Sequence, residues 1–247
     1  MRRMFTAVLC TMLAFAGSAT LAQDPEQEQY VKDAQAKLKA TFQNLTVNDF
    51  KPSPVEGLFE INIGGRVVYF HPDAEVLIFG EIFSKDGRSL TQESQALTNA
   101  DMAADIPTEL AVVIGPEDGV PIVEFTDPDC PYCREYHNYI TGVGQPVKRI
   151  IFFETRIHPS ARPKAIHVLC AEDQEAAFLE VYNNPNMTEF NTCENGEEMA
   201  NAHLTISKGA GVNATPTLYL GRTPVRGFRR DAIAQYIAEQ ARLLASN

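Results

Sequence analysis

The sequence is short of positive charge and of cysteine, and each shortage excludes a class of protein. Its 247 residues include 21 Lys or Arg against 32 Asp or Glu, for a formal net charge of −11. A chain this acidic is poorly suited to nucleic acid or to an anionic membrane surface, so we expect no nucleic-acid partner. We favour solubility as the reason for the acidity over a dedicated basic partner. Five cysteines are too few for a fold that depends on disulfides.

Long apolar runs are also scarce, and the one that exists lies at the start of the chain. Two arginines precede Met4–Ala16, which is almost wholly apolar but shorter than the roughly 20 residues that a spanning helix needs. Thr20–Ala22 fits a small-x-Ala cleavage site. We therefore predict a signal peptide over residues 1–22 and an exported protein that starts at Gln23. An uncleaved membrane anchor is the alternative.

The next part of the chain combines a helix with strands. Residues 23–45 carry apolar side chains at helical spacing, with charged residues on the other faces. Strand-like segments follow at Leu58–Ile63, Arg66–Phe70 and Val76–Phe83. Gly64-Gly65 between the first two is a hairpin signal. We predict a small α+β domain over residues 23–88.

A polar, helix-compatible stretch separates the two halves of the chain. It ends before Pro107, and we predict a linker helix within residues 89–107. The alternative is that this helix is the last element of the first domain.

The order of elements over residues 108–247 is typical of a thioredoxin-like α/β domain with a helical insertion. The expected strands are Val120–Thr126, Lys148–Phe153 and Thr217–Leu220, followed by a turn and a further strand. The expected helices are 130–140, 161–171, 174–182, 196–208 and 231–244. The first of these strands is continuously apolar, as buried central strands are.

The motif that carries chemistry is Cys130-Pro131-Tyr132-Cys133. The thiolate is the nucleophile in thiol chemistry, and a helix N-terminus stabilises its negative charge. We expect Cys130 to be the exposed attacker and Cys133, one turn further in, to resolve the mixed disulfide. Pro131 suits the first helical position, which needs no donor. Zinc is less favoured because there is no second Cys-x-x-Cys, and we expect neither metal nor cofactor.

Two neighbours of the motif are candidates for supporting roles. Glu124 lies in the apolar strand that enters the motif and is a candidate proton acceptor for Cys133, with an exposed strand residue as the alternative. Thr215-Pro216 precedes a strand, and a proline there implies a turn or a cis bond. We expect this loop to present the Thr215 backbone to an extended substrate beside Cys130.

The other two cysteines of the exported chain are Cys170 and Cys193, since Cys10 lies in the predicted signal peptide. They could close a loop whose entropy contributes about 3 kcal/mol. We favour a structural bridge over a second redox pair, because neither lies in a close-spaced motif. The histidines interpreted as structural or surface residues are His137, His158 and His167.

These residues resemble the DsbC/DsbG group of periplasmic disulfide isomerases over nearly the whole exported chain. The stretches that carry the resemblance are Val123–Cys133, Lys164–Cys170, Cys193, Gly211–Thr217, Pro54–Glu60 and Gly80–Phe83. The resemblance implies a cystatin-like dimerisation domain, helical linkers and a V-shaped homodimer in the periplasm. It also implies that a membrane reductant of the DsbD type keeps Cys130 reduced for attack on misoxidised exported proteins. Under the same resemblance, Cys170 and Cys193 form the structural bridge.

Departures from the group leave the direction of electron flow open. The Cys-Pro-Tyr-Cys motif is closer to DsbG, whose relatives are linked to reduction of sulfenic acids. Glu124 resembles the buried acid of thioredoxin and of DsbA oxidases more than the apolar residue usual in DsbC. The leading hypothesis is an isomerase or reductase. The alternatives are a sulfenic acid reductase, a dithiol oxidase, a holdase chaperone and an exported protein with two inert disulfides.

Overall fold

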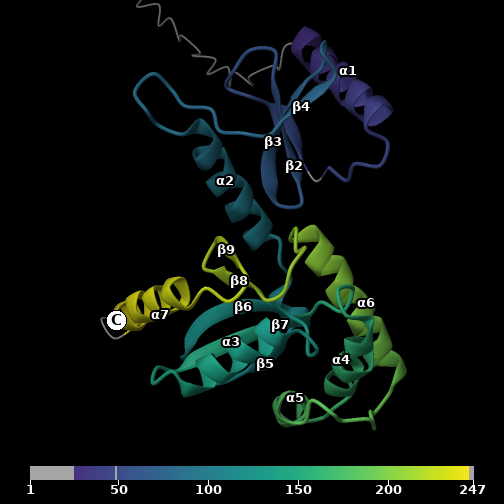
Figure 1. Cartoon of the computed structure of the whole chain (residues 1–247), viewed down its shortest axis with the longest axis vertical. Helices are drawn as coiled ribbons and strands as arrows, with labels where there is room; N and C mark the ends of the chain where they lie inside the picture. Colours follow the sequence, from purple (N-terminus) through teal and green to yellow (C-terminus); the bar gives the residue numbers. More distant parts are fainter. Residues whose placement is uncertain (1–24, 48, 245–247) are drawn as a thin grey trace, which may run out of the picture.

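A computed structural model describes residues 25–47 and 49–244 (Figure 1). The predicted signal peptide, residues 1–22, and the predicted start at Gln23 lie outside the described residues. Within the described ranges, no helix is both long and apolar enough to cross a membrane. The chain forms two sheets in separate parts of the molecule, and helix α2 (Leu90–Ala104) runs from the first towards the second.

The first sheet is a four-stranded antiparallel meander in the order β1-β2-β3-β4. Its strands are β1 (Phe50–Pro52), β2 (Phe59–Ile63), β3 (Arg66–His71) and β4 (Val76–Ile78). Helix α1 (Pro25–Thr41) covers one face, where Ala34 and Leu38 pack against Phe59 and Phe70. Alternate residues of β2 point to the opposite face, because side chains alternate along a strand.

Helix α2 covers that opposite face through polar contacts. The Ser89 hydroxyl caps the helix by accepting from the N–H of Gln92. Ser94 donates to the buried Glu60 carboxylate, and the hydroxyls of Tyr69 and Thr91 share a 2.6 Å hydrogen bond. Hydrogen bonds therefore fix the start of the connecting helix to the first sheet.

The second sheet has five strands in the order β5-β7-β6-β8-β9. They are β5 (Val112–Ile114), β6 (Val120–Thr126), β7 (Val147–Phe153), β8 (Thr217–Leu220) and β9 (Thr223–Arg226). The central strand β6 runs parallel to β7, from Val120 opposite Val147 to Thr126 opposite Phe153, and the other pairings are antiparallel. The carboxyl ends of β6 and β7 therefore meet at one edge of the sheet.

Helices cover both faces of this sheet. They are α3 (Pro131–Gly142), α4 (Arg162–Leu169), α5 (Gln174–Asn183), α6 (Glu194–Gly209) and α7 (Arg230–Leu244). One buried cluster joins Tyr136 of α3 and Ile233 of α7 to Ile122 of β6. Another joins the inserted helices to the sheet through Ala165, Phe178 and other apolar residues. The predicted fold class, an α+β unit joined by a helix to a thioredoxin-like unit with a helical insertion, is confirmed.

Short edge strands account for the differences from the sequence analysis. The predicted strand Val76–Phe83 ends at Ile78, because β4 is an edge strand and Gly80 follows it closely. The three-residue strands β1 and β5 were not predicted, since three residues are too few to show a period. The predicted domain boundaries at 88 and 107 stay predictions, and α2 lies between them.

Candidate active site

The Cys130–Cys133 motif lies where β6 has ended and α3 begins. Cys130 is the N-cap residue, with φ −76° and ψ 122°, and Pro131 is the first residue of the helix. The N–H groups of Cys133 and Arg134 donate to the Cys130 carbonyl at 3.1 and 3.2 Å. Neither cysteine is in a disulfide. Both thiols therefore occupy the first turn of α3, where the helix N-terminus favours an anion.

The exposure of Cys130 is lower than predicted. Cys130 is 5% exposed and Cys133 0% exposed, so the expected order holds but the attacker is not an exposed residue. The reason is that Cys130 Sγ lies against the loop that carries Thr215, 3.4 Å from the Thr215 carbonyl oxygen. Tyr132, between the two cysteines, is 61% exposed. Access to Cys130 is therefore narrow and lies next to an exposed aromatic ring.

The two thiols differ in their readiness to ionise. A hydrogen bond from Cys133, aided by the backbone N–H groups of Tyr132 and Cys133, lowers the pKa of Cys130 to about 5 against the opposing effect of burial. Burial raises the pKa of Cys133 far above its ordinary value. At neutral pH Cys130 is a thiolate and Cys133 a thiol. That is the difference that a nucleophile and a resolving group need.

The Thr215–Pro216 peptide bond is cis, and its loop lies beside Cys130. The Gly227 N–H donates to the Pro216 carbonyl at 2.7 Å and ties the loop to the end of β9. The Thr215 residue is buried, and a hydrogen bond from it also favours the Cys130 thiolate. The backbone of Thr215 is thus held next to the thiol of Cys130.

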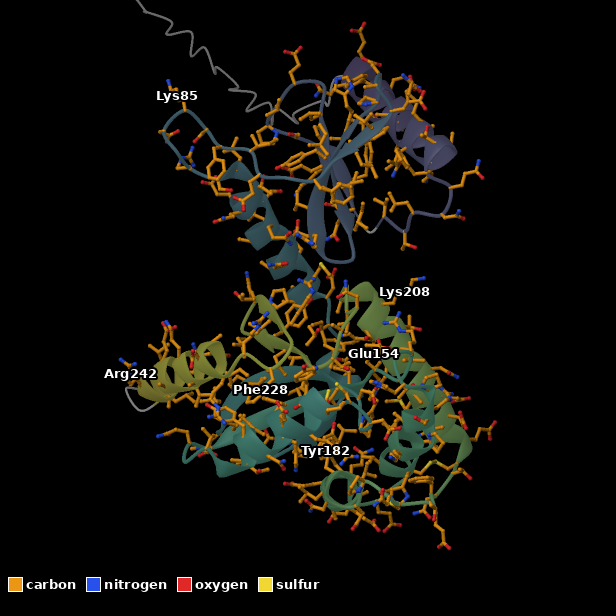
Figure 2. All side chains as sticks on the ribbon, viewed as in Figure 1. Lys85, Glu154, Tyr182, Lys208, Phe228 and Arg242 are labelled. Carbon is orange, nitrogen blue, oxygen red and sulfur yellow. A yellow bond between two sulfur atoms is a disulfide. The ribbon has the colours of Figure 1, made fainter. Side chains whose placement is uncertain are left out.

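An ion pair anchors the segment that leads into this loop. Arg156 Nη2 donates to the Val212 carbonyl at 3.2 Å and pairs with the buried carboxylate of Glu154, just after β7 (Figure 2). Ser207 of α6 also donates to Glu154. Burial opposes ionisation of Glu154, but the hydrogen bonds from Arg156 and Ser207 hold its pKa below the ordinary value. The loop is therefore fixed to both β7 and α6.

The turn between β2 and β3 reaches the same loop from the first sheet. Arg226 of β9 donates to the Gly64 carbonyl at 3.1 Å. Gly65 and Gly211 have φ values of +76° and +64°, and a Cβ on Gly211 would lie 3.0 Å from the Gly65 nitrogen. Both the left-handed backbone and the close approach require glycine. The two sheets thus touch backbone to backbone at the segment that precedes Thr215.

Glu124 is buried in β6, so the alternative of an exposed strand residue is wrong. Its carboxylate is fully buried and accepts from Arg149 Nε and Nη2, each at 2.9 Å. Arg149 lies on the neighbouring strand β7 and is buried as well. The Asp127 N–H donates to Cys133 Sγ at 3.4 Å. The proton-acceptor role of Glu124 therefore stays a prediction, and the structure shows the residue as a buried ion-pair partner of Arg149.

Two polar pairs next to the cysteines were missed. Thr126 shares a 2.7 Å hydrogen bond with Tyr182 of α5, which Figure 2 labels. The Thr126 hydroxyl also bonds to Cys133. Asp127 Oδ2 accepts from His158 Nδ1 at 2.8 Å. His158 was interpreted as a structural or surface residue. The available signal was that Asp127 and His158 follow two parallel neighbouring strands, whose carboxyl ends share one edge of the sheet.

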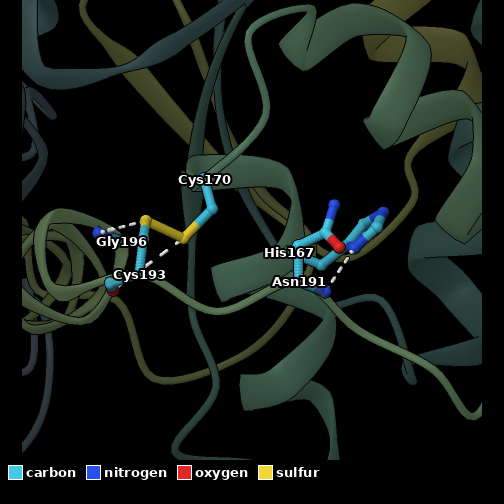
Figure 3. The surroundings of a disulfide bond; sticks show 5 residues. All are labelled: His167, Cys170, Asn191, Cys193 and Gly196. Atoms are coloured by element: carbon cyan, nitrogen blue, oxygen red, sulfur yellow. Dashed lines mark hydrogen bonds between the residues drawn. A yellow bond between two sulfur atoms is a disulfide. The ribbon is translucent and has the colours of Figure 1, made fainter.

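The other two histidines have structural contacts. Burial and Arg149 lower the pKa of His137 to about 4, so its ring is neutral at neutral pH. His167 Nδ1 accepts from the Asn191 N–H at 3.0 Å (Figure 3). Across residues 25–47 and 49–244, no group of three or more His, Cys, Asp or Glu side chains is placed to hold a metal ion.

Cys170 and Cys193 form a disulfide that joins the end of α4 to the start of α6 (Figure 3). Cys170 is the C-cap residue of α4, and Cys193 is the N-cap residue of α6. The N–H of Gly196 donates to Cys193 Sγ at 3.2 Å. The bridge therefore fixes the first and the last helix of the insertion, α4 and α6, to each other.

Comparisons with known proteins bear on both halves of the chain. The family profile described as the disulfide bond isomerase protein N-terminal domain matches residues 19–92. The probable thiol:disulfide interchange protein DsbC of Bordetella avium is 30% identical over 159 residues, which are 63% of this chain and 56% of that protein. The thiol:disulfide interchange protein DsbC of Dickeya dadantii is 23% identical over 216 residues, which are 84% of this chain and 89% of that protein.

Solved structures give weaker similarities. The thiol-disulfide exchange protein alpha-DsbA2 from Wolbachia pipientis has a TM-score of 0.49 and 16% identity, over 60% of this chain and 98% of that one. A disulfide interchange protein from Neisseria gonorrhoeae has a TM-score of 0.44 and 21% identity, over 53% of this chain and 96% of that one.

Proposed function

This chain belongs to the DsbC/DsbG family of thiol:disulfide interchange proteins and is a thiol–disulfide oxidoreductase, and we propose that it isomerises or reduces wrong disulfides in exported proteins. The observation that carries the proposal is the contrast between two reduced thiols in one helical turn. The pKa of Cys130 is lowered to about 5, whereas burial raises that of Cys133. A nucleophile and a resolving thiol are thus available at neutral pH.

The proposed reaction begins with the Cys130 thiolate. It attacks one sulfur of a client disulfide, so that a bond forms between Cys130 and the client while the client's own bond breaks and a client thiolate leaves. In isomerisation that thiolate attacks another disulfide of the client, and a client thiolate later displaces Cys130 with no net change in electrons. In reduction Cys133 loses its proton and attacks Cys130 Sγ. The client then leaves as a dithiol, and the enzyme becomes the disulfide.

The loop that contains Thr215 supports docking of an extended client segment. Its backbone is fixed beside Cys130, and Tyr132, which lies between the two cysteines in sequence, offers an exposed ring. Extended peptides bind through backbone hydrogen bonds with pockets for alternate side chains. We therefore propose Thr215 and Pro216 as the docking residues of the site.

We also propose a homodimer formed through residues 23–88. Apolar side chains are exposed on and after the edge strand β4: Val76, Ile78, Phe79 and Phe83. Phe79 is 73% exposed. Large apolar side chains that group on a surface usually mark an interface, so these four residues indicate where a second copy binds. Each edge strand also presents unpaired backbone groups, which a second copy can satisfy.

The setting proposed for this reaction is the periplasm. Disulfides persist in oxidising compartments outside the cytosol, and the Cys170–Cys193 bridge is of this kind. Each reductive cycle oxidises the two active thiols, so a dithiol reductant of the DsbD type must restore them. The low pKa of Cys130 stabilises the reduced form and makes the disulfide form a ready electron acceptor.

The test is the refolding of a scrambled multi-disulfide protein by the reduced full-length enzyme. Isomerisation is expected to recover the client's activity and to be lost in Cys130→Ser. The Cys133→Ser variant separates the two modes, since isomerisation by Cys130 alone persists while net reduction stops. Cys170 and Cys193 stay paired in all three proteins and provide the matched background.

Three outcomes would contradict the proposal. Oxidation of a reduced client by the disulfide form, without any recovery of the scrambled one, would identify a dithiol oxidase. Turnover of a sulfenic acid on a lone cysteine, with no refolding, would identify a sulfenic acid reductase. Refolding assistance that survives Cys130→Ser would identify a holdase chaperone.

A further inference from the structure

Asp127 contacts both active cysteines through its backbone. Its carbonyl accepts from the Cys130 N–H at 3.0 Å, and its N–H donates to Cys133 Sγ at 3.4 Å. Its carboxylate is fully buried. One carboxylate oxygen accepts from the Asp129 N–H and the other from His158 Nδ1, each at 2.8 Å. The active-site turn thus encloses a carboxylate whose ion-pair partner is His158.

His158 connects this buried carboxylate to solvent. It lies just beyond β7, whose carboxyl end neighbours that of β6, and its side chain is 38% exposed. An imidazole that reaches water can exchange protons freely, whereas Asp127 cannot. Histidine is also the side chain whose charge changes near neutral pH. The pair therefore joins the buried Asp127 carboxylate to the His158 imidazolium, which can lose its charge by deprotonation.

The charges of Asp127, His158 and Cys130 depend on one another. The hydrogen bond to Asp127 raises the pKa of His158, and the negative charge of Cys130 raises it further. Burial raises the pKa of Asp127, and the Cys130 charge adds to that effect. The thiolate thus repels the carboxylate and attracts the imidazolium. Without the imidazolium, an unpaired carboxylate would face the thiolate.

The other charged groups around the pair already have partners. Asp129 pairs with Lys164 and accepts from Ser160 Oγ at 2.7 Å. Arg134 of α3 donates to the Tyr182 carbonyl at 2.7 Å, and its charge also favours ionised Asp129. The arginine and the lysine keep their charge at neutral pH. His158 is therefore the cation beside Cys130 whose charge responds to mild changes of pH.

We propose that Asp127 and His158 are positioning residues that stabilise the Cys130 thiolate and thereby set how oxidising the Cys130–Cys133 disulfide is. The imidazolium offsets the repulsion between carboxylate and thiolate, and its deprotonation restores that repulsion. Less stabilisation of the thiolate makes the reduced form less favourable, which weakens the disulfide as an oxidant. The inference deepens the proposed exchange reaction, but its titrations need no client.

The first experiment compares two variants that act in opposite directions. His158→Gln keeps a donor to Asp127 but removes the positive charge, and Asp127→Asn keeps an acceptor but removes the negative charge. Thiolate absorbance at 240 nm, followed against pH in the reduced full-length protein, gives the midpoint for Cys130. We expect the midpoint to rise by about one pH unit in His158→Gln, to fall in Asp127→Asn and to return near the parent value in the double variant.

The equilibrium constant with glutathione is expected to follow these midpoints. We expect the ratio of reduced to oxidised enzyme at equilibrium to fall about tenfold in His158→Gln. In Asp127→Asn we expect this ratio to rise above that of the parent. His71→Gln, which removes a histidine from the first sheet, is the matched control and should change neither quantity. Shifts of both variants in the same direction, or shifts equal to that of the control, would overturn the proposal.

A second measurement uses the unaltered sequence and does not depend on how a variant folds. Coupling between two protonation sites is reciprocal, so removal of the Cys130 charge must lower the pKa of His158. NMR titration of the His158 ring is compared between the reduced protein and the protein alkylated at Cys130. An unchanged His158 titration would refute the inference. A failed refolding assay with the expected titrations would contradict the proposed function and leave the charge coupling intact.

Discussion

Two pairs of cysteines in one chain show how the surroundings decide what a thiol does. Cys130 and Cys133 share one helical turn and are reduced, with a lowered pKa for the first and a raised pKa for the second. Cys170 and Cys193 join the ends of two helices in a disulfide. The first pair lies beside the loop that contains Thr215, and the second joins two packed helix ends. Cys130 and Cys193 are both N-cap residues, so the partner of each sulfur, rather than its position in a helix, separates the reactive pair from the structural one.

The largest effect on activity is expected from removal of the proposed nucleophile, Cys130. Cys130→Ser should lower the rate of disulfide reduction at least about 10³-fold, because a hydroxyl is not ionised at neutral pH. Its free energy of unfolding should change by no more than about 1 kcal/mol. Turnover of an insulin substrate and denaturant unfolding measure the two quantities. A variant that kept a tenth of the activity would place the chemistry elsewhere.

Removal of the bridge should produce the opposite pattern. The double variant Cys170→Ala, Cys193→Ala should lose about 3 kcal/mol of unfolding free energy, since the disulfide limits the entropy of the unfolded chain. The rate of disulfide reduction per folded molecule should stay within about twofold. Denaturant unfolding followed by far-UV circular dichroism is the measurement. A large loss of activity in the folded variant would mean that the second pair takes part in exchange.

A smaller effect comes from the space around the bridge. A Cβ on Gly196 would lie 2.3 Å from Cys170 Sγ, so Gly196→Ala should destabilise the fold by about 1–3 kcal/mol through overpacking. Gly209, in the same helix α6, has nothing within 4 Å of such a Cβ and is the matched control. Thermal unfolding compares the two variants. Equal melting temperatures would show that the bridge yields to an added methyl group.

The active pair should differ from an ordinary thiol in its response to pH. Because the pKa of Cys130 is lowered to about 5, its thiolate persists above that pH and is lost below it. Alkylation of Cys130 should therefore slow about tenfold between pH 7 and pH 4, with half of the change near pH 5. Iodoacetamide kinetics with mass-spectrometric assignment measure this. A midpoint near pH 8.5, as in a free cysteine, would contradict the charge distribution of the site.

Much of the fold could be predicted because its elements carry clear local signals. The continuous apolar run of β6, the glycine pair between β2 and β3 and the proline at the start of α3 each specify one local structure. The edge strands β1 and β5 have three residues each, and only tertiary pairing defines them. Local pattern is therefore informative where an element is long or ends at a residue with special backbone geometry.

The site was less predictable because its electrostatics depend on residues far apart in sequence. The position of Glu124 suggested a role near Cys133, but its partner Arg149 lies on another strand and takes up both carboxylate oxygens. His158 reaches Asp127 from the end of a neighbouring strand. A single sequence shows which ionisable residues are present. It does not show which charges cancel, because that depends on the register between strands.

The glycine contact between the two sheets makes the substrate-facing loop a shared part of both units. Gly65 lies against Gly211, and Arg226 donates a hydrogen bond to the Gly64 carbonyl in the turn. The side chains of Arg226 and Met102 also lie against these two glycines, so the contact leaves no free space between the turn and the backbone that leads to Thr215. In the proposed dimer, the domain that joins the two copies therefore contacts the loop that is proposed to bind the client. A displacement of a bound client would then also act on the interface between the two copies.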